Sequence, residues 1–250
     1  MTQRSSTLVR GLQAFTITFW LADLALLLAS PDTYRRFILK DGLDKPGAAS
    51  VLDYGAETLT ILVLIPGILC ALAALVLYRR RIPSTLALLW LLAWTAACIY
   101  FAGEECSWGQ WYFKWGTPET FQQINDQGET NLHNTTSWLD QKPRALVELF
   151  IVCGGLIVPV LARYSAGIQA LAARPLVAWA LAPSLCWPAA AVLLILRSLS
   201  FIKTPFFHQL ANSEVCELAT AWFLGLYLVS YLLRLKAPGD SAQPGRLAQT

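Results

Sequence analysis

Six long apolar segments alternate with polar connections along this 250-residue chain. Each is long enough to cross the roughly 30 Å hydrocarbon core of a bilayer, which takes about 20 helical residues. The pattern predicts an all-α fold, a polytopic bundle of six transmembrane helices in one integral membrane domain, residues 1–236. The predicted spans are residues 12–30, 57–78, 84–103, 145–163, 175–197 and 214–234.

Composition supports a membrane protein and narrows its partners. Hydrophobic residues make up 56% of the chain and charged residues 14%, whereas roughly a quarter of a soluble domain is charged. The first span is too long for a signal peptide and ends at Pro31, so we expect a retained helix. The net charge of +3 forms no basic stripe, which argues against nucleic acid and leaves the lipid bilayer as the predicted partner. Residues 237–250 predict a disordered tail.

Basic residues orient the predicted bundle. Residues 79–81 are three consecutive arginines in the turn between spans two and three, and short loops rich in Lys and Arg stay in the cytoplasm. Six spans place both termini on one side, so both are predicted to be cytoplasmic. The connections after spans one, three and five then share the outer side, where both histidines would gather with Glu104, Glu105, Glu129, Glu214 and Glu217.

An interfacial helical insertion is predicted between spans three and four, at residues 104–144. Aromatic residues, which favour the headgroup zone, interleave there with Gln110 and Lys114. A second short helix is predicted from Thr117, as its cap, to about Asp126. The aromatic residues are Trp108, Trp111, Tyr112, Phe113 and Trp115.

Two acids, Glu104 and Glu105, close the third span. A carboxylate at a helix C-terminus opposes the helix dipole, and acids at a membrane edge are costly unless they pair or bind something. Adjacent helical residues point about 100° apart, so at most one of the two is expected to face the bundle interior. A bound cation or a positive partner would offset their repulsion. The alternative is a solvated helix end.

The polar segment 127–134 contains Glu129 and His133. An extended chain would place alternate residues on one face, and a helix would place Glu129 and His133 one turn apart. Both geometries bring a carboxylate to an imidazole, which suits a metal-ligand pair or an acid/base pair. The alternative is a polar loop held by its own Asn and Thr hydrogen bonds.

His208, Glu214 and Glu217 lead into the sixth span. Glu214 and Glu217 share a helix face, although acids in a first helical turn are favoured by the dipole without any further role. The predicted topology sets this group beside the first two clusters. Asp23 lies within the first span, where an isolated acid must pair or be protonated.

The six cysteines form no C-x-x-C pair, which gives zinc-ribbon and thioredoxin-type sites no support. Four lie well inside predicted spans, where they are most simply small apolar residues. Cys106 and Cys216 lie in polar stretches, Cys216 at the start of the sixth span, and an oxidising outer side would allow a disulfide between them.

Three stretches of the polar region carry a resemblance. They read Gly-Glu-Glu-Cys-Ser-Trp-Gly-Gln at 103–110, Thr-Pro-Glu at 117–119 and Gln-Gly-Glu-Thr-Asn-Leu-His-Asn at 127–134. This pattern resembles one in uncharacterised multi-pass bacterial inner-membrane proteins. It covers about thirty residues closely and the other spans only in hydropathy. The resemblance implies a bacterial inner-membrane location and nothing about a reaction.

The residues support three functional hypotheses. The first is a membrane-embedded, metal-dependent enzyme that acts on a lipid or lipid-linked substrate at the outer face. An oxygen-rich ligand set with two imidazoles suits a divalent Zn, Mn or Fe ion, which can activate water. The second is a transporter or an accessory subunit of a membrane complex, which Asp23 would suit. The third is haem held by His133 and His208.

The first hypothesis assigns the candidate roles. The expected catalytic residues are Glu104, Glu105, Glu129 and His133. The expected metal ligands are Glu105, Glu129, His133, His208 and Glu217. The residues expected to bind substrate or to support these groups are Trp108, Gln110, Gln127, Asn131, Asn134, Asp23 and Glu214.

Overall fold

The computed structural model describes residues 3–39, 55–125, 128–132 and 135–237. In these residues the chain is helical and contains no strand, which confirms the predicted all-α fold. Six helical segments are long and apolar enough to cross a membrane. They are Ser6–Ala29, Gly55–Leu77, Thr85–Glu105, Gln141–Leu161, Pro175–Leu199 and Ser213–Lys236.

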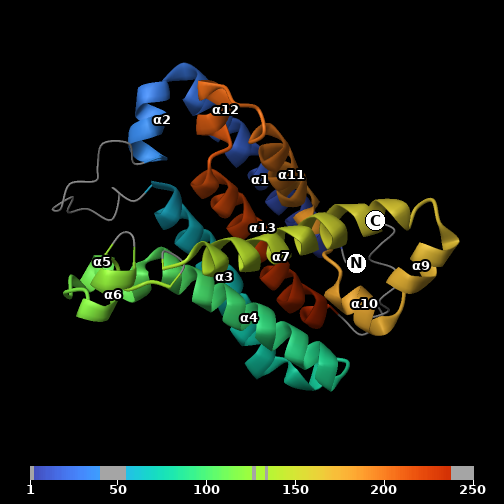
Figure 1. The fold of residues 1–250 in the computed structure, drawn as a ribbon. Helices are drawn as coiled ribbons and strands as arrows, with labels where there is room; N and C mark the ends of the chain where they lie inside the picture. Colours follow the sequence, from blue (N-terminus) through green and yellow to red (C-terminus); the bar gives the residue numbers. More distant parts are fainter. Residues whose placement is uncertain (1–2, 40–54, 126–127, 133–134, 238–250) are drawn as a thin grey trace.

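The helices are labelled in chain order in Figure 1. The α-helices are α1 (Gln3–Ala29), α2 (Pro31–Phe37), α3 (Gly55–Leu77), α4 (Thr85–Glu105), α5 (Gln110–Phe113), α6 (Glu119–Ile124), α7 (Ser137–Val152), α8 (Val158–Leu161), α9 (Ala166–Ala172), α10 (Pro175–Ala180), α11 (Trp187–Leu199), α12 (Pro205–Leu210) and α13 (Ser213–Lys236). Tighter helical turns are η2 (Arg79–Arg81), η3 (Ser107–Gly109) and η5 (Ser184–Cys186), and the wider π-helical turn η4 (Cys153–Ile157) joins α7 to α8.

Helix α13 is the centre of the bundle. Of its membrane-length window 83% is buried, against 17–44% for the other five segments. It packs most extensively against α3 and next against α11, while α3 also packs against α4. It is nevertheless the least hydropathic of the six, with a mean hydropathy of 1.5. A helix enclosed by other helices can carry polar side chains, because these find partners inside the protein.

Glycines bring α3 and α13 into close contact. A Cβ added to Gly67 would lie 2.8 Å from the backbone of Gly225, and one added to Gly225 would lie 2.7 Å from the carbonyl oxygen of Val63. Both distances are too short for a real side chain. Small residues at helix interfaces allow this close backbone packing within a membrane.

The fifth predicted span, residues 175–197, is interrupted. Helix α10 ends at Ala180, and α11 begins only after Pro183, which cannot continue a helix in its interior. Carbonyl groups at the end of α10 accept hydrogen bonds from side chains of α13 instead of from a continuing helix. Tyr227 Oη donates to the Ala180 oxygen at 2.5 Å, and Arg234 donates to three further carbonyl groups. The break is therefore supported by polar side chains from the central helix.

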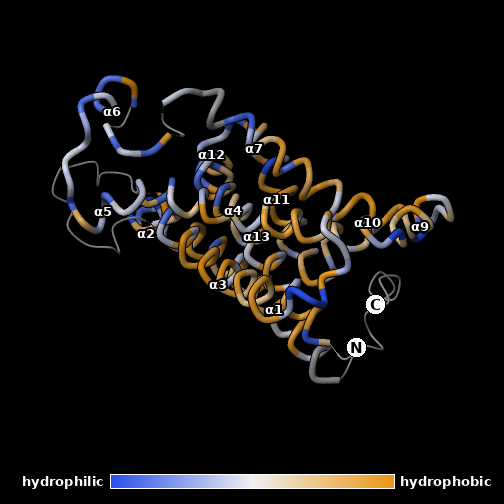
Figure 2. Tube along the Cα trace, turned by 90° about the horizontal axis from the view of Figure 1, so that it is seen from below, coloured by the Kyte–Doolittle hydropathy of each residue, from blue (hydrophilic) through white to orange (hydrophobic). Residues whose placement is uncertain are grey.

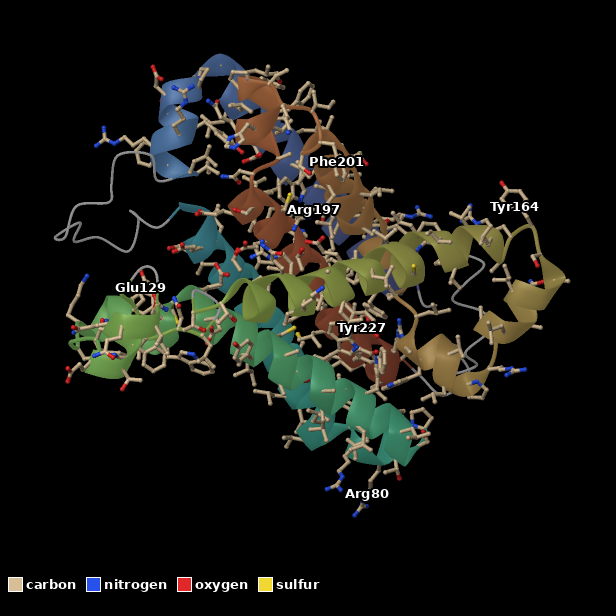
Figure 3. All side chains as sticks on the ribbon, in the orientation of Figure 1. Arg80, Glu129, Tyr164, Arg197, Phe201 and Tyr227 are labelled. Carbon is tan, nitrogen blue, oxygen red and sulfur yellow. The ribbon has the colours of Figure 1, made fainter. Side chains whose placement is uncertain are left out.

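The polar connections gather at one end of the bundle. Figures 1 and 2 show α2, α5 and α6 at one end and α9 and α10 at the other, with hydrophilic residues concentrated toward α2, α5 and α6. Arg80, in the turn between α3 and α4, lies away from that end (Figure 3). We call the end that carries α2, α5, α6 and α12 the polar end. The connections after the first, third and fifth spans lead into it.

In the described residues of the insertion, the α-helices that precede α7 are α5 and α6, and both are short. Helix α5 is a single turn, and α6 covers only Glu119–Ile124. The prediction of Thr117 as the cap is wrong: Pro118 stands at that position, and Thr117 Oγ1 donates to the Gly128 carbonyl at 2.6 Å. Thr117 thus joins the two ends of the loop around α6. The predicted end of this helix, Asp126, lies outside the described residues.

Candidate functional site

Glu105 is the last residue of α4, and it lies inside the bundle at the polar end with 7% of its surface exposed. Its carboxyl group forms a side-chain hydrogen bond with Glu217, and Glu57 and Glu214 are its other acidic neighbours. Three helices therefore bring carboxyl groups to one place, because Glu57 lies in the first turn of α3, and Glu214 and Glu217 lie near the start of α13. The three helices are far apart in sequence.

The hydrogen bond between Glu105 and Glu217 requires a proton, because two carboxylates can only repel each other. Glu217 Oε1 also pairs with Arg144 Nη2 of α7 at 2.6 Å, and the two side chains are 13% and 22% exposed. The ion pair favours a carboxylate on Glu217 and leaves Glu105 as the proton donor. Glu105, Glu217 and Arg144 therefore form a proton-sharing row across α4, α13 and α7.

A second ion pair lies beside this row. Arg197 of α11 donates from Nε at 2.9 Å to both oxygens of Glu148 in α7, and its Nη2 contacts the same carboxylate. Glu217 and Cys216 are among the groups that interact electrostatically with Arg197. A fork-like guanidinium facing both carboxylate oxygens is the strong form of this pairing. Figure 3 labels Arg197 on α11.

Glu104 takes its partners from the insertion. Its Oε1 accepts from Trp108 Nε1 at 2.6 Å and its Oε2 accepts from the Leu132 amide at 2.6 Å. The chain turns back sharply to make this possible, since Ser107 and Trp108 have φ values of 47° and 56°. Such left-handed conformations cost about 1 kcal/mol or more outside glycine. Gly103 leaves room for the Trp108 ring, which lies 2.8 Å from where a Cβ would be.

Glu129 lies in the same insertion (Figure 3) and is hydrogen-bonded to Asn131. Glu129 Oε2 accepts from Ser107 Oγ at 2.5 Å and from Asn131 Nδ2 at 2.9 Å. Asn125 Nδ2 donates to Asn131 Oδ1 at 2.7 Å. Gln110 is bound in the same way, since its Oε1 accepts from the Thr130 amide at 2.8 Å. These contacts match the alternative interpretation of the segment, a polar loop held by its own side chains.

Asp23 is buried in α1 and accepts a hydrogen bond from Tyr34 Oη at 3.3 Å. Tyr34, on α2, is completely buried. Burial, and after it the Asp23 carboxyl group, raises the pKa of the Tyr34 hydroxyl, which therefore remains a donor. Cys216 of α13 also interacts electrostatically with Tyr34. The first two helices are thus linked to the central helix near the Glu105–Glu217 row.

His208 is exposed on α12 and lines a pocket with Arg35 of α2, and none of the residues that line this pocket is acidic. Gln127, His133 and Asn134 lie outside the described residues. Within the part of the chain that the structure describes, no three His, Cys, Asp or Glu side chains are placed to hold one metal ion. Of the five expected metal ligands, the structure brings Glu105 and Glu217 into contact.

All six cysteines are free thiols, so the suggested disulfide between Cys106 and Cys216 is not formed. Cys106 Sγ instead donates to the Ala102 carbonyl at 3.2 Å. Burial raises the pKa of the Cys106 thiol, and the Glu104 carboxylate adds to the rise, while backbone amides offset part of it. This cysteine is therefore a weak nucleophile at neutral pH.

Arg144 and Arg197 are the cations of the two ion pairs, and neither was among the residues expected at the site. A signal was present in the topology. Arg197 ends the fifth span and Glu148 begins the fourth, and both positions belong to the same side of the predicted bundle. Opposite charges at the matching edges of neighbouring spans favour pairing.

Comparison with protein-family models, curated proteins and solved structures gives no match. The class of the protein therefore rests on its own helices, which define an all-α bundle with six segments able to cross a membrane. Its candidate site is the group of buried charged side chains at the polar end.

Proposed function

We propose that this protein is a membrane-embedded enzyme whose reacting groups are Glu105 and Glu217. The proton-sharing contact between these two carboxyl groups is the observation that carries the proposal. Two carboxyl groups in different protonation states form a general acid and a general base within one site. Glu217, held by Arg144, would accept a proton from an attacking hydroxyl group, and Glu105 would donate one to the leaving group.

A lipid or lipid-linked substrate suits the surroundings of this pair. Trp108, Tyr112, Phe113 and Trp115 of the insertion are exposed although they are large and apolar or amphipathic. Such side chains favour the boundary between headgroups and acyl chains. A substrate held in the membrane could therefore reach the polar end sideways from the bilayer.

A divalent Zn, Mn or Fe ion is the second part of the proposal. The donors fit such an ion, because two carboxylates could hold a cation in place of the proton between them, and Glu105 would then be a ligand instead of the general acid. When bound, it would activate water or polarise a substrate oxygen. Glu129 is hydrogen-bonded to Ser107 and Asn131, and His208 lines the pocket beside Arg35. We therefore propose His133 as the further, imidazole ligand.

We place the protein in the bacterial inner membrane, with the polar end outside and both termini in the cytoplasm. The support is the Arg79–Arg81 turn, which is the densest basic connection and lies away from the polar end. The sequence resemblance to multi-pass inner-membrane proteins agrees. Cysteine accessibility to a membrane-impermeant reagent, scored at single cysteines placed at Ser84 and Lys203, tests this orientation directly.

The test of the proposed enzyme combines activity with metal content. Purified protein is incubated with labelled membrane lipids, and hydrolysis or transfer is followed by chromatography. Glu105→Gln and Glu217→Gln are each expected to lower turnover by at least 100-fold, whereas Glu119→Gln, an exposed acid of α6, is the matched control. Full turnover in both variants would refute the assignment of these groups.

Metal content is measured on the same preparations by inductively coupled plasma mass spectrometry. The expected result is near-stoichiometric metal that is lost in the Glu105→Gln/Glu217→Gln double variant and in His133→Ala. Absence of metal together with full in vivo function of His133→Ala would remove the metal from the proposal. The acid/base role of the two carboxyl groups would then stand alone.

Proton-coupled transport is the second candidate, and the buried Asp23–Tyr34 contact favours it. Cys216 interacts electrostatically with Tyr34 and with Arg197, and Arg197 interacts with Glu217. Polar side chains therefore lead from α1 to the Glu105–Glu217 contact. Protein in liposomes loaded with a pH-sensitive dye would then move protons, and Asp23→Asn would stop the movement. An unchanged proton flux in Asp23→Asn would exclude this candidate.

A further inference from the structure

A pocket of about 290 Å³ opens at the polar end between α2 and α12. Water occupies about 30 Å³ per molecule in the liquid, so the pocket has room for a phosphate group and a small alcohol attached to it. Its polar lining comes from both helices and from the residue that caps α13. The lining residues are Arg35, Leu39, Pro205, His208, Gln209 and Asn212.

The polar side chains of this pocket are arranged as hydrogen-bond donors. With its amide oriented to satisfy both groups, Gln209 accepts from Arg35 Nε at 2.8 Å and Nη2 at 2.5 Å. In that orientation the amide nitrogen of Gln209 faces hydrogen-bond acceptors, so Gln209 serves to hold Arg35. Asn212 Oδ1 accepts from the Val215 amide at 2.8 Å, which leaves Asn212 Nδ2 as a donor.

The charge of the pocket is positive. None of its six lining residues is acidic, and Arg35 supplies a permanent cation. Asp32 approaches Arg35 Nη1 at 3.7 Å, but its side chain is 97% exposed, so solvent screens this contact. Gln209 fixes the guanidinium from the other side. An arginine already held in place is well suited to an anion with several oxygens.

Exposed aromatic residues occur on the elements next to the pocket in the chain. Phe37 ends α2 and Phe201 precedes α12, and 84% of the Phe201 surface is exposed (Figure 3). A polar, positively charged pocket at an end of the bundle with exposed aromatic residues suits the zone where lipid headgroups meet acyl chains. A phosphate reaching this pocket can therefore come from a lipid headgroup or from solution.

We propose that this pocket binds a phosphate group, with Arg35 and His208 as its anchors. The site is separate from the Glu105–Glu217 pair and needs no reaction to be observed. Binding is measured by isothermal titration calorimetry on the detergent-purified full chain. The probes are inorganic phosphate, a short-chain phosphatidic acid and a short-chain diacylglycerol that lacks the phosphate.

The expected result is that phosphatidic acid binds and diacylglycerol does not. Arg35→Gln/His208→Gln should weaken that binding at least tenfold, whereas Arg36→Gln, the neighbouring exposed arginine outside the pocket, should leave it unchanged. Arg35→Lys, which keeps the charge but loses the fork, should weaken it less than Arg35→Gln. Parallel binding of inorganic phosphate would assign the site to the free anion, and its absence would assign it to lipid headgroups.

Two results would overturn the proposal. One is equal affinity of the wild type and the Arg35→Gln/His208→Gln variant for every phosphate-bearing probe. The other is an equal loss of affinity in Arg36→Gln, which would reveal a general attraction between basic residues and anions. An unchanged melting temperature confirms that each variant is folded. Because the Glu105→Gln/Glu217→Gln double variant should bind phosphate normally, failure here and failure of the proposed enzyme are distinguishable.

Discussion

Glu104 and Glu105 are neighbours in the chain, but they take their partners from different parts of the molecule. Glu104 binds Trp108 and Leu132 of the insertion, whereas Glu105 binds Glu217 of the central helix. Both carboxyl groups are buried, and Glu105 is the one that contacts another membrane-length helix. Glu104 therefore holds the insertion in place, whereas Glu105 belongs to the candidate reacting pair.

Substituting each glutamate by glutamine should therefore have different results. Glu104→Gln places an amide nitrogen against an N–H donor, and we expect it to destabilise the insertion by about 1–3 kcal/mol. Glu105→Gln can still donate to Glu217, so its melting temperature should stay close to that of the wild type. Limited proteolysis of the insertion and thermal unfolding in detergent measure the two effects. The same response in both variants would contradict this division.

The ion pair between Arg144 and Glu217 should contribute measurably to stability because both side chains are largely buried. We expect a double-mutant cycle with Arg144→Gln and Glu217→Gln to give a coupling energy of about 1–2 kcal/mol. The exposed Arg35–Asp32 pair, measured with Arg35→Gln and Asp32→Asn, provides the control and should show no measurable coupling. Equal coupling in the two pairs would mean that burial does not strengthen the Arg144–Glu217 contact.

Most of the bundle could be predicted from sequence because hydropathy depends on composition over about 20 residues. All six spans were found, with ends within six residues of the observed segments. Averaging hydropathy over a whole span also hid the helix break at Pro183, since the residues around this proline are apolar. The breaking signal was the proline itself, and its support by Tyr227 depends on a helix far along the chain.

The candidate site could be predicted only in part. The partnership of Glu105 with Glu217 follows from topology, because both lie at the same end of neighbouring helices. The role of Arg144 does not, since hydropathy gives the side of the membrane but not the facing of a single side chain. Thr117 shows the same limit in a loop: its cap signal was local, whereas its hydroxyl bonds to Gly128, eleven residues away.

The close contact between α3 and α13 should make Gly225 intolerant of any side chain. We expect Gly225→Ala to lower the free energy of unfolding by about 1–3 kcal/mol, because its Cβ would meet the Val63 carbonyl at 2.7 Å. Gly11→Ala in α1 is the matched control, since nothing lies within 4 Å of its added Cβ. Thermal unfolding in detergent compares the two. A loss in Gly11→Ala as large as that in Gly225→Ala would rule out close packing as the cause.

The thiol of Cys106 should ionise at a higher pH than an ordinary cysteine. Only the thiolate is alkylated, so a raised pKa lowers the reactive fraction near neutral pH and moves the half-maximal rate to higher pH. Iodoacetamide labelling of native protein, resolved at Cys106 by peptide mass spectrometry across a pH series, measures this midpoint. Protein unfolded in sodium dodecyl sulfate is the reference, because unfolding removes the burial that raises the pKa.

The Glu104→Gln variant separates the two causes of this rise. Removing the carboxylate charge should move the native midpoint part of the way down toward the reference, because burial is the larger cause and Glu104 the smaller one. The midpoint, rather than the absolute rate, is the informative quantity, since burial also slows access of the reagent at every pH. A native midpoint at or below that of unfolded protein would show that Cys106 lies in a more open or more positive environment than this structure describes.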